Sequence, residues 1–230
     1  MISIAIDGPG GAGKSTISKE IAKRMGIVYV DTGALYRTVG YYVQQKGISV
    51  EQAKDYDTVT PYLCEINIDI KYFDGTQHVL LCGEDLGDKI RRPEISMYAS
   101  AVSSVKSVRE FLLDTQRNIA KNNDVIMDGR DIGTVILPDA DVKIFLTAST
   151  EARAMRRYRE LCEKNLGANN EKVSYDKVLS ELVERDRADS ERALAPCVPA
   201  ADAMVLDNSE LTFEESVNAI LKIINEKTGR

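Results

Sequence analysis

The sequence predicts an α/β fold in which a five-stranded parallel sheet lies between layers of helices. Three observations lead to this expectation: five short apolar runs typical of buried strands, helical patterns between them, and a β-prone segment that interrupts the alternation. Strands that alternate with helices form parallel sheets through right-handed crossovers. The β-prone segment predicts a small antiparallel insertion.

The expected elements follow the chain in order. The apolar runs cover residues 2–6, 27–30, 124–128, 142–146 and 203–206. Helical patterns cover residues 14–25, 34–45, a stretch from about 93, and residues 105–121, 150–163, 175–190 and 213–227. The insertion contains β-prone residues 65–74 and 77–82 with a hairpin signal at Asp74-Gly75, and a polar break covers residues 165–170.

Composition excludes several classes of function. A formal net charge of -6 argues against general nucleic-acid binding, which depends on a surplus of Lys and Arg. No apolar run reaches the roughly 20 residues of a membrane-spanning helix, and the first residues lack the basic region of a signal peptide. Four widely spaced cysteines and one histidine form no zinc or disulfide pattern. We therefore expect a cytoplasmic protein with no nucleic-acid or membrane partner.

Residues 8–15 form the strongest motif of the chain, G-P-G-G-A-G-K-S, which fits the P-loop pattern G-x-x-x-x-G-K-[ST]. Its place between an expected strand and an expected helix is the context that a P-loop requires. The glycines let successive N–H groups point at one phosphate, and the helix directs the positive end of its dipole there. Lys14 then supplies a cation for the β- and γ-phosphates, and the Ser15 hydroxyl is placed to bind Mg²⁺.

A P-loop alone does not separate kinases from GTPase switches or ATP-driven motors. The chain lacks the N-K-x-D-type guanine motif, and it is short for a motor. A small-molecule kinase needs a second anion site, and residues 31–37, D-T-G-A-L-Y-R, form a candidate at the end of the second expected strand. We expect the Thr32 hydroxyl and the Arg37 guanidinium to bind a phosphate there.

A third polar group, D-G-R-D at 128–131, ends another expected core strand. We expect Asp128 to hold Mg²⁺ through a bound water, and Arg130 and Asp131 to face the acceptor. No paired acid and base carboxylates are apparent, and none is needed, because the acceptor is an anionic phosphate oxygen. Catalysis then comes from alignment and from cations around the transferring phosphoryl group.

Two expected helices are rich in arginine. The first carries Arg153, Arg156, Arg157 and Arg159. On the second, Arg185, Asp189 and Arg192 have spacings of i, i+4 and i+7, which predict one helical face. A carboxylate and two guanidinium groups on one face suit a ribose and a phosphate together.

The motifs resemble those of the bacterial cytidylate kinases over nearly the whole chain. The matching stretches are I-D-G-P-G-G-A-G-K-S-T at 6–16, D-T-G-A-L-Y-R at 31–37, D-G-R-D-I-G-T at 128–134, E-R-D-R-A-D-S-E-R at 184–192 and P-C-V-P-A-A-D-A at 196–203. Other monophosphate kinases share the P-loop but not the D-G-R-D-x-G-T stretch. The resemblance implies a three-layer P-loop kinase fold in one domain over 1–230, with a monophosphate-binding insertion at about 62–90 and a short helical lid at about 149–170.

The resemblance also implies the residues of both binding sites. The residues that would bind ATP are Gly8, Pro9, Gly10, Gly11, Ala12, Gly13, Lys14, Ser15 and Thr16. The residues that would bind CMP are Thr32, Arg37, Ser100, Arg109, Arg130, Asp131, Arg185, Asp189 and Arg192. The catalytic residues would be Lys14, Asp128, Arg130 and the lid arginines Arg153 and Arg157. Serine is common in the family where this chain has Thr32, and the hydroxyl is kept.

The chemistry of these residues suits cytosine. Asp131 can accept a hydrogen bond from the N4 amine, while Ser100 and Arg109 can donate to the ring acceptors. Uracil has a carbonyl in place of that amine, which would face a carboxylate unfavourably.

The expected reaction is transfer of the γ-phosphate of ATP to CMP, and also to dCMP, with Mg²⁺, by a monomeric enzyme. The alternatives are a kinase for another monophosphate, UMP or AMP, and a P-loop switch or regulatory module without fast transfer. Three arginines, Arg37, Arg130 and Arg192, favour a kinase, because a switch has no use for a second phosphate site.

Overall fold

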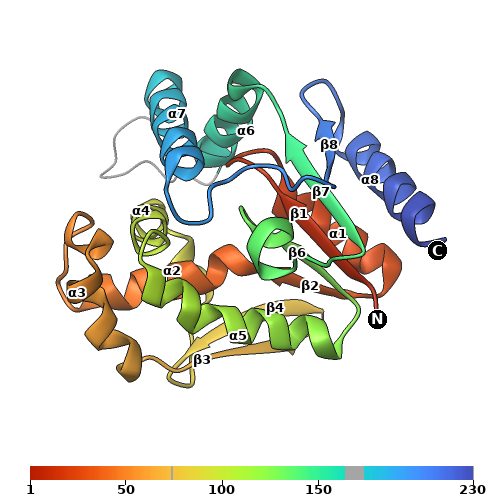
Figure 1. Cartoon of the computed structure of the whole chain (residues 1–230). Coiled ribbons are helices and arrows are strands. Elements are labelled where there is room, and N and C mark those ends of the chain that lie inside the picture. Colours follow the sequence, from red (N-terminus) through yellow and green to blue (C-terminus); the bar gives the residue numbers. More distant parts are fainter. Residues whose placement is uncertain (74, 164–173, 230) are drawn as a thin grey trace. The chain divides into compact units, whose positions relative to one another are not determined.

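The computed structural model describes residues 1–73, 75–163 and 174–229, and its larger sheet has the five strands that the apolar runs predict (Figure 1). They are β1 (Ser3–Asp7), β2 (Val28–Asp31), β6 (Val125–Asp128), β7 (Val142–Thr147) and β8 (Met204–Asp207), in the spatial order β2-β6-β1-β7-β8. β1 pairs in parallel with β6 and with β7, and β7 pairs in parallel with β8. The predicted α/β class with a five-stranded parallel sheet is confirmed.

Contacts within the chain divide it into two compact units. The first contains Met1 and residues 28–123, and the second contains the described parts of 2–27 and 124–230. The expectation of one domain over the whole chain stays a prediction, as do the proposed extents of the insertion and the lid.

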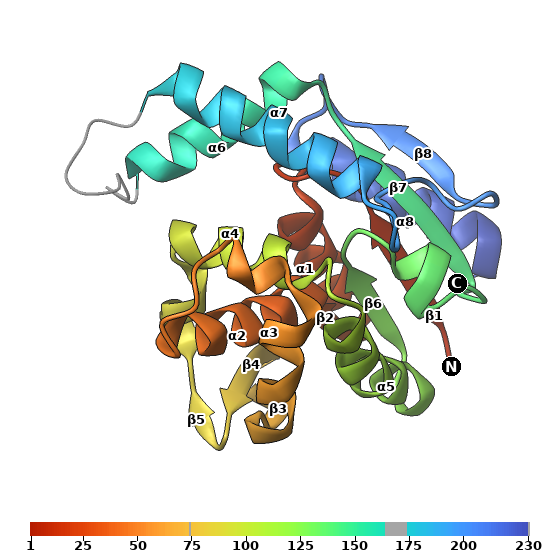
Figure 2. The same ribbon diagram turned by 60° about the vertical axis from the view of Figure 1, so that its left-hand side comes forward.

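The second unit is built around β1, in which four of the five residues are buried. Ile6 of β1 lies opposite Asp128 of β6, so these two parallel strands end at the same edge. The α-helices of this unit in the described residues are α1 (Lys14–Met25), α6 (Thr150–Glu163), α7 (Tyr175–Glu191) and α8 (Phe213–Thr228). α1 packs against β6 and α8, and α6 lies beside α7 in both views (Figures 1 and 2).

The first unit has its own apolar core. Its α-helices in the described residues are α2 (Thr32–Gln45), α3 (Tyr56–Val59), α4 (Pro93–Val102) and α5 (Lys106–Asn122). Their buried faces meet around Leu35, Val102 and Leu112. A Cβ atom on Gly40 of α2 would lie 2.9 Å from the backbone nitrogen of Ala99 in α4, so glycine is required for these helices to approach this closely.

The first unit also contains the predicted antiparallel insertion. Its strands are β3 (Ile68–Phe73), β4 (Thr76–Leu81) and the short β5 (Glu84–Asp85), in that spatial order. Ile68 pairs with Leu81 and Phe73 with Thr76. Residue 74 of the expected hairpin signal lies outside the described residues.

Several short helical segments, including one at Gly87–Arg91, are not predicted by the sequence patterns. Short turns of helix cover Gln52–Lys54, Tyr56–Val59 and Thr60–Glu65, and a π-helical segment covers Ile132–Ile136. Each is too short to show a helical period, so periodicity could not reveal it. The expected polar break at 165–170 lies outside the described residues. No helix in the described part of the chain has both the length and the apolar character needed to cross a membrane.

Candidate functional site

The P-loop leaves the end of β1 in a conformation that glycine alone permits. Gly8 has φ +142°, and a Cβ atom on it would lie 2.0 Å from the carbonyl oxygen of Leu146. Gly13 has φ +89° and caps the N-terminus of α1, which begins at Lys14. The strand, glycine-rich turn and helix therefore follow one another as the motif predicts.

The Lys14 side chain is buried within this loop. Its Nζ donates hydrogen bonds to the carbonyl oxygens of Gly8, at 2.6 Å, and Pro9, at 2.7 Å. Burial, together with the nearby Arg130 guanidinium, lowers the pKa of Lys14 to about 7. The loop thus holds a cation at the helix N-terminus, where an anion would bind.

Ser15, in the first turn of α1, meets Asp128, at the end of β6, beside the loop. The Ser15 hydroxyl donates a hydrogen bond of 2.7 Å to the carboxylate of Asp128, the buried last residue of β6. One hydroxyl and one carboxylate are hard oxygen donors of the kind that Mg²⁺ prefers. The pair fits a magnesium ion that also keeps water ligands.

Arg130 lies two residues after Asp128, and two nitrogen atoms of its guanidinium group donate hydrogen bonds. Its Nε donates to the Asp189 carboxylate at 2.8 Å, and its Nη1 donates to the Gly8 carbonyl oxygen at 3.0 Å. Burial opposes the charge on Arg130, but Asp189 and other nearby anions outweigh it and raise the pKa of this guanidinium. Burial likewise acts against the Asp189 charge, yet Arg130 and Arg185 hold the pKa of that carboxyl below its usual value.

The first lid arginine, Arg153, is buried rather than free at the surface of α6. Its Nη1 donates to the Gly10 carbonyl oxygen at 2.9 Å and lies 2.6 Å from the Asp186 carboxylate. Arg157 is more exposed and pairs with Glu160 of the same helix at 2.8 Å. Arg153 therefore touches the P-loop directly, whereas Arg157 has a local partner.

The predicted helical stripe of Arg185, Asp189 and Arg192 is wrong in one respect. α7 ends at Glu191, and Arg192 already has extended backbone angles, with φ -62° and ψ 138°. Its Nε instead donates to the Ala195 carbonyl oxygen at 2.7 Å.

Arg192 nevertheless stays close to the carboxylates of the site. Its Nη1 lies 3.9 Å from Asp189 and its Nη2 lies 3.9 Å from Asp131. Arg185 also approaches Asp189, at 4.0 Å. Both aspartates are buried, so the cluster places two anions between guanidinium groups.

The first unit holds the other predicted CMP residues. Asp31 accepts a hydrogen bond from the Ala34 N–H at 3.0 Å and pairs with Arg37 at 2.7 Å. The carboxylate therefore caps α2 and orients the arginine that the helix carries. Thr32 is buried at the first position of that helix.

Arg109 and Ser100 lie on neighbouring helices of the same unit. Arg109 is buried in α5, where its Nη1 donates to the Ser103 carbonyl oxygen at 3.1 Å. Its guanidinium carbon lies 5.6 Å from the centre of the Tyr36 ring. Ser100 is half-buried in α4.

Sequence analysis missed two polar residues that support the site. Gln77 of β4 accepts a hydrogen bond from the Asp31 N–H at 2.7 Å and donates one to the Asp31 carbonyl oxygen at 3.2 Å. Asn208, which is buried just after β8, donates to the Ala12 carbonyl oxygen at 3.1 Å and accepts from Arg156 at 3.1 Å. No motif marks Gln77, but a polar residue that follows a core strand could have indicated Asn208.

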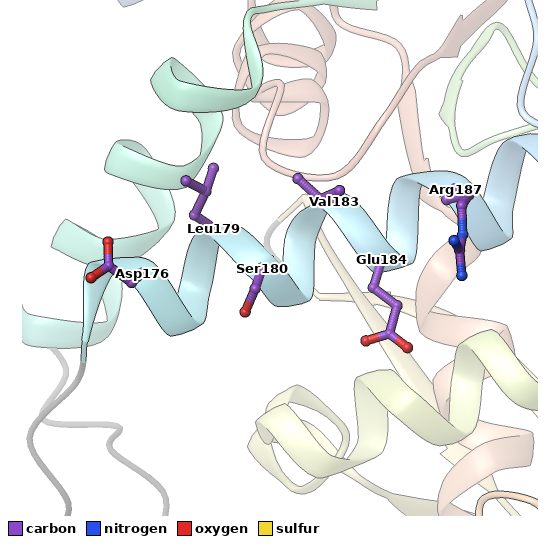
Figure 3. A pocket seen from close by; sticks show the side chains of 6 residues that line it. All are labelled: Asp176, Leu179, Ser180, Val183, Glu184 and Arg187. Atoms are coloured by element: carbon purple, nitrogen blue, oxygen red, sulfur yellow. The ribbon is translucent and has the colours of Figure 1, made fainter.

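Two hollows lie within the second unit. Figure 3 shows one along a single face of α7, lined by Asp176, Leu179, Ser180, Val183, Glu184 and Arg187. None of the predicted site residues lines it. The other is bounded by Pro9 of the P-loop, Arg153 and Asp189 among others, and so adjoins the predicted site.

Comparisons with known proteins identify relatives over the whole chain. A family model described as cytidylate kinase matches residues 4–226. A cytidylate kinase of Caldicellulosiruptor saccharolyticus is 48% identical over 228 residues, which cover 99% of this chain and 97% of that protein. One of Thermosipho melanesiensis is 46% identical over 224 residues, which cover 97% of each. An uncharacterized protein from Eubacterium ventriosum, at 11% identity and a TM-score of 0.52 over 98% of this chain and 99% of that one, shares the fold alone.

Proposed function

The chain belongs to the cytidylate kinase family, and from this premise we propose that it transfers the γ-phosphate of ATP to CMP, giving CDP and ADP. We extend the proposal to dCMP as a second acceptor. The observation that supports the chemistry most directly is the shared edge of β1 and β6, where the P-loop and the D-G-R-D stretch begin side by side.

We infer that residues 8–16 bind ATP. The loop N–H groups and the N-terminus of α1 favour a polyphosphate, and Lys14 supplies the cation that accompanies the transferring phosphoryl group. Arg153 contacts the loop through Gly10, which suits a role near the same phosphates. Arg157 would act with it, in a short lid at about 149–170 whose last residues fall outside the described part.

The CMP residues divide between a phosphate set and a base set. In the proposal, Thr32, Arg37 and Arg130 bind the acceptor phosphate, since guanidinium groups form paired hydrogen bonds with phosphate oxygens. Ser100, Arg109 and Asp131 recognise the cytosine edge. The remaining contacts, with the sugar and the phosphate, come from Arg185, Asp189 and Arg192.

No general base is required for this transfer. The attacking atom is a phosphate oxygen that already carries negative charge, so the protein's task is to align it and to neutralise charge on the transferring group. Lys14, Arg130, Arg153 and Arg157 are the cations proposed for that task. Closure over the bound nucleotides would keep water from competing as acceptor.

We infer that Mg²⁺ is held by the Ser15 hydroxyl and, through a water, by the Asp128 carboxylate. A bound magnesium ion supplies charge neutralisation at the phosphate oxygens. We also propose that the enzyme is cytoplasmic, where ATP and CMP occur, and that it acts as a monomer.

A coupled assay of ADP release with CMP, dCMP, UMP and AMP as separate acceptors tests the proposal. We expect rapid release with CMP and dCMP and slow release with UMP and AMP. Faster release with UMP or AMP than with CMP would overturn the substrate assignment. Equal slow release with and without any acceptor would indicate a nucleotide-binding switch instead.

A further inference from the structure

Asp7 is the last residue of β1, and its buried carboxylate is not explained by any role described above. Oδ1 accepts a hydrogen bond from the Ile132 N–H at 2.7 Å, and Oδ2 accepts one from the Gly133 N–H at 2.7 Å. Both N–H groups lie in the first turn of the π-helical segment that follows the D-G-R-D stretch. The first N–H groups of a helical segment have no partner within it, and Asp7 satisfies two of them.

A second contact runs in the opposite direction. Arg130 donates from Nη1 to the carbonyl oxygen of Gly8, the residue after Asp7, at 3.0 Å. The end of β1 is therefore joined to the chain just before Asp131 through Gly8 and to the chain just after it through Asp7. The two residues that we assign to CMP, Arg130 and Asp131, therefore lie between a contact with Gly8 and the contacts with the Asp7 carboxylate.

Gly133 lies directly against the carboxylate. A Cβ atom on Gly133 would be 3.3 Å from the Asp7 Oδ2 and 3.2 Å from the Lys143 side chain. The absence of a side chain lets the backbone N–H reach the carboxylate at hydrogen-bond distance. Alanine would force one of these neighbours to shift by a few tenths of an ångström.

We propose that Asp7 is a positioning residue for phosphoryl transfer, whose two carboxylate oxygens hold the Ile132 and Gly133 N–H groups and so fix Arg130 and Asp131 at the start of the P-loop. The inference rests on the proposed function, in which those two residues bind CMP. Only a carboxylate offers two acceptor oxygens here, because an amide side chain would turn its NH₂ group towards one of the N–H donors.

Burial and the charges around Asp7 set the pH at which its carboxylate is protonated. Burial raises its pKa to about 6, the two N–H groups lower it, the Asp131 carboxylate raises it and the Lys14 ammonium lowers it. The Cys197 thiol also faces Asp7, whereas the Lys143 side chain contributes only its methylene carbons near Gly133 because its ammonium group pairs with Asp202. Above pH 6 both oxygens accept fully, whereas below it a proton weakens one of the two bonds.

The test compares Asp7→Asn with Asp141→Asn at pH 8. Asp141 is a matched control, because its carboxylate accepts from the Ser3 N–H at 2.8 Å near the other end of β1. The pH is chosen because phosphate monoesters such as CMP lose their second proton near pH 6, and at pH 8 the substrate is fully ionised. The readouts are kcat, the KM values of CMP and ATP, and the urea midpoint of unfolding.

We expect Asp7→Asn to lower kcat about ten- to hundredfold and to raise the KM of CMP, with the KM of ATP and the urea midpoint close to those of the control. The amide resonance of Gly133 in the substrate-free wild type should titrate with a midpoint near pH 6, and this titration should be absent from Asp7→Asn. Wild-type kinetics in Asp7→Asn, or a loss of activity matched by an equal loss of stability, would overturn the proposal.

Gly133→Ala keeps the Asp7 carboxylate but places a methyl group against it. This variant is the alternative test if Asp7→Asn does not fold. We expect Gly133→Ala to lower kcat, as Asp7→Asn does, but only a few-fold. Wild-type kinetics in a folded Gly133→Ala, with an unchanged amide titration at residue 133, would also contradict the proposal. Failure of the wild type itself to phosphorylate CMP would instead refute the proposed function, so the two failures are distinguishable.

Discussion

The Lys14 ammonium donates a hydrogen bond of 2.6 Å to the carbonyl oxygen of Gly8, the residue at which its own loop begins. Carbonyl groups of the loop thus take the place of water around a buried cation. A phosphate oxygen is a stronger partner for an ammonium group than a neutral carbonyl is. We therefore expect Lys14 to exchange this contact for ATP phosphates when the nucleotide binds.

Replacing Lys14 with Met should lower kcat about 10²- to 10³-fold, because it removes a cation that stabilises the transferring phosphoryl group. The fold should persist, since methionine fills a similar volume and removes a buried charge. Lys23→Met, an exposed position on the same helix, is the control. A folded Lys14→Met variant with near-normal kcat would refute the P-loop assignment.

Replacing Asp131 with Ala should weaken CMP far more than ATP. The variant loses the proposed acceptor for the cytosine amine, and an unpaired buried donor costs about 1–3 kcal/mol, or roughly a ten- to hundredfold loss of affinity. Discrimination against UMP should decline in parallel. The measurement is the ratio of kcat/KM for CMP and UMP, with the exposed Asp139→Ala as control. An unchanged ratio would contradict a base-recognition role.

Replacing Gln77 with Leu should raise the KM of CMP up to about tenfold and leave the KM of ATP unchanged. The amide makes two hydrogen bonds with the backbone of Asp31, which caps the helix that carries Thr32 and Arg37. Their loss, at roughly 1 kcal/mol, would loosen the proposed phosphate site. Thr76→Leu, next to it in β4 and exposed, is the control. Equal KM values of CMP in both variants would count against this role.

The free energy of unfolding should depend on pH through Asp7. Its pKa is 3.8 in the unfolded reference and about 6 in the folded protein, so the neutral acid is favoured by folding. This stabilisation, about 3 kcal/mol in full, is present below pH 3.8 and is lost as the pH rises through 6. Urea unfolding of wild type and Asp7→Asn at pH 5, 6.5 and 8 measures it. We expect the wild type to lose stability relative to the variant as pH rises, and parallel pH dependences would contradict this.

The elements that the sequence predicted best are those with long or strongly apolar patterns. The helix at 150–163 matches α6 in full, and the five core strands differ from expectation by one or two residues. Their buried faces impose a regular period, which a single sequence shows directly. The P-loop was equally clear, because its glycines meet steric demands such as that at Gly8.

What could not be predicted depends on contacts between distant residues. Gln77 and Asp31 are 46 positions apart, and nothing in the local sequence indicates that they form a hydrogen bond. The end of α7 before Arg192 is likewise set by the following chain, where Ala195 has φ +50° and accepts the Arg192 hydrogen bond. The expected helix ended at residue 190, but the i, i+4 and i+7 spacing alone placed Arg192 on the same helical face, just beyond the last residue of α7.

The central claim is that this chain moves a phosphoryl group from ATP to CMP rather than to water. Phosphorus-31 NMR of the wild-type protein with ATP, CMP and Mg²⁺ tests it directly, because each product has its own resonances. The account predicts that CDP and ADP form in equal amounts while CMP disappears and inorganic phosphate stays near the level seen without protein. Release of inorganic phosphate with CMP unconsumed would contradict it.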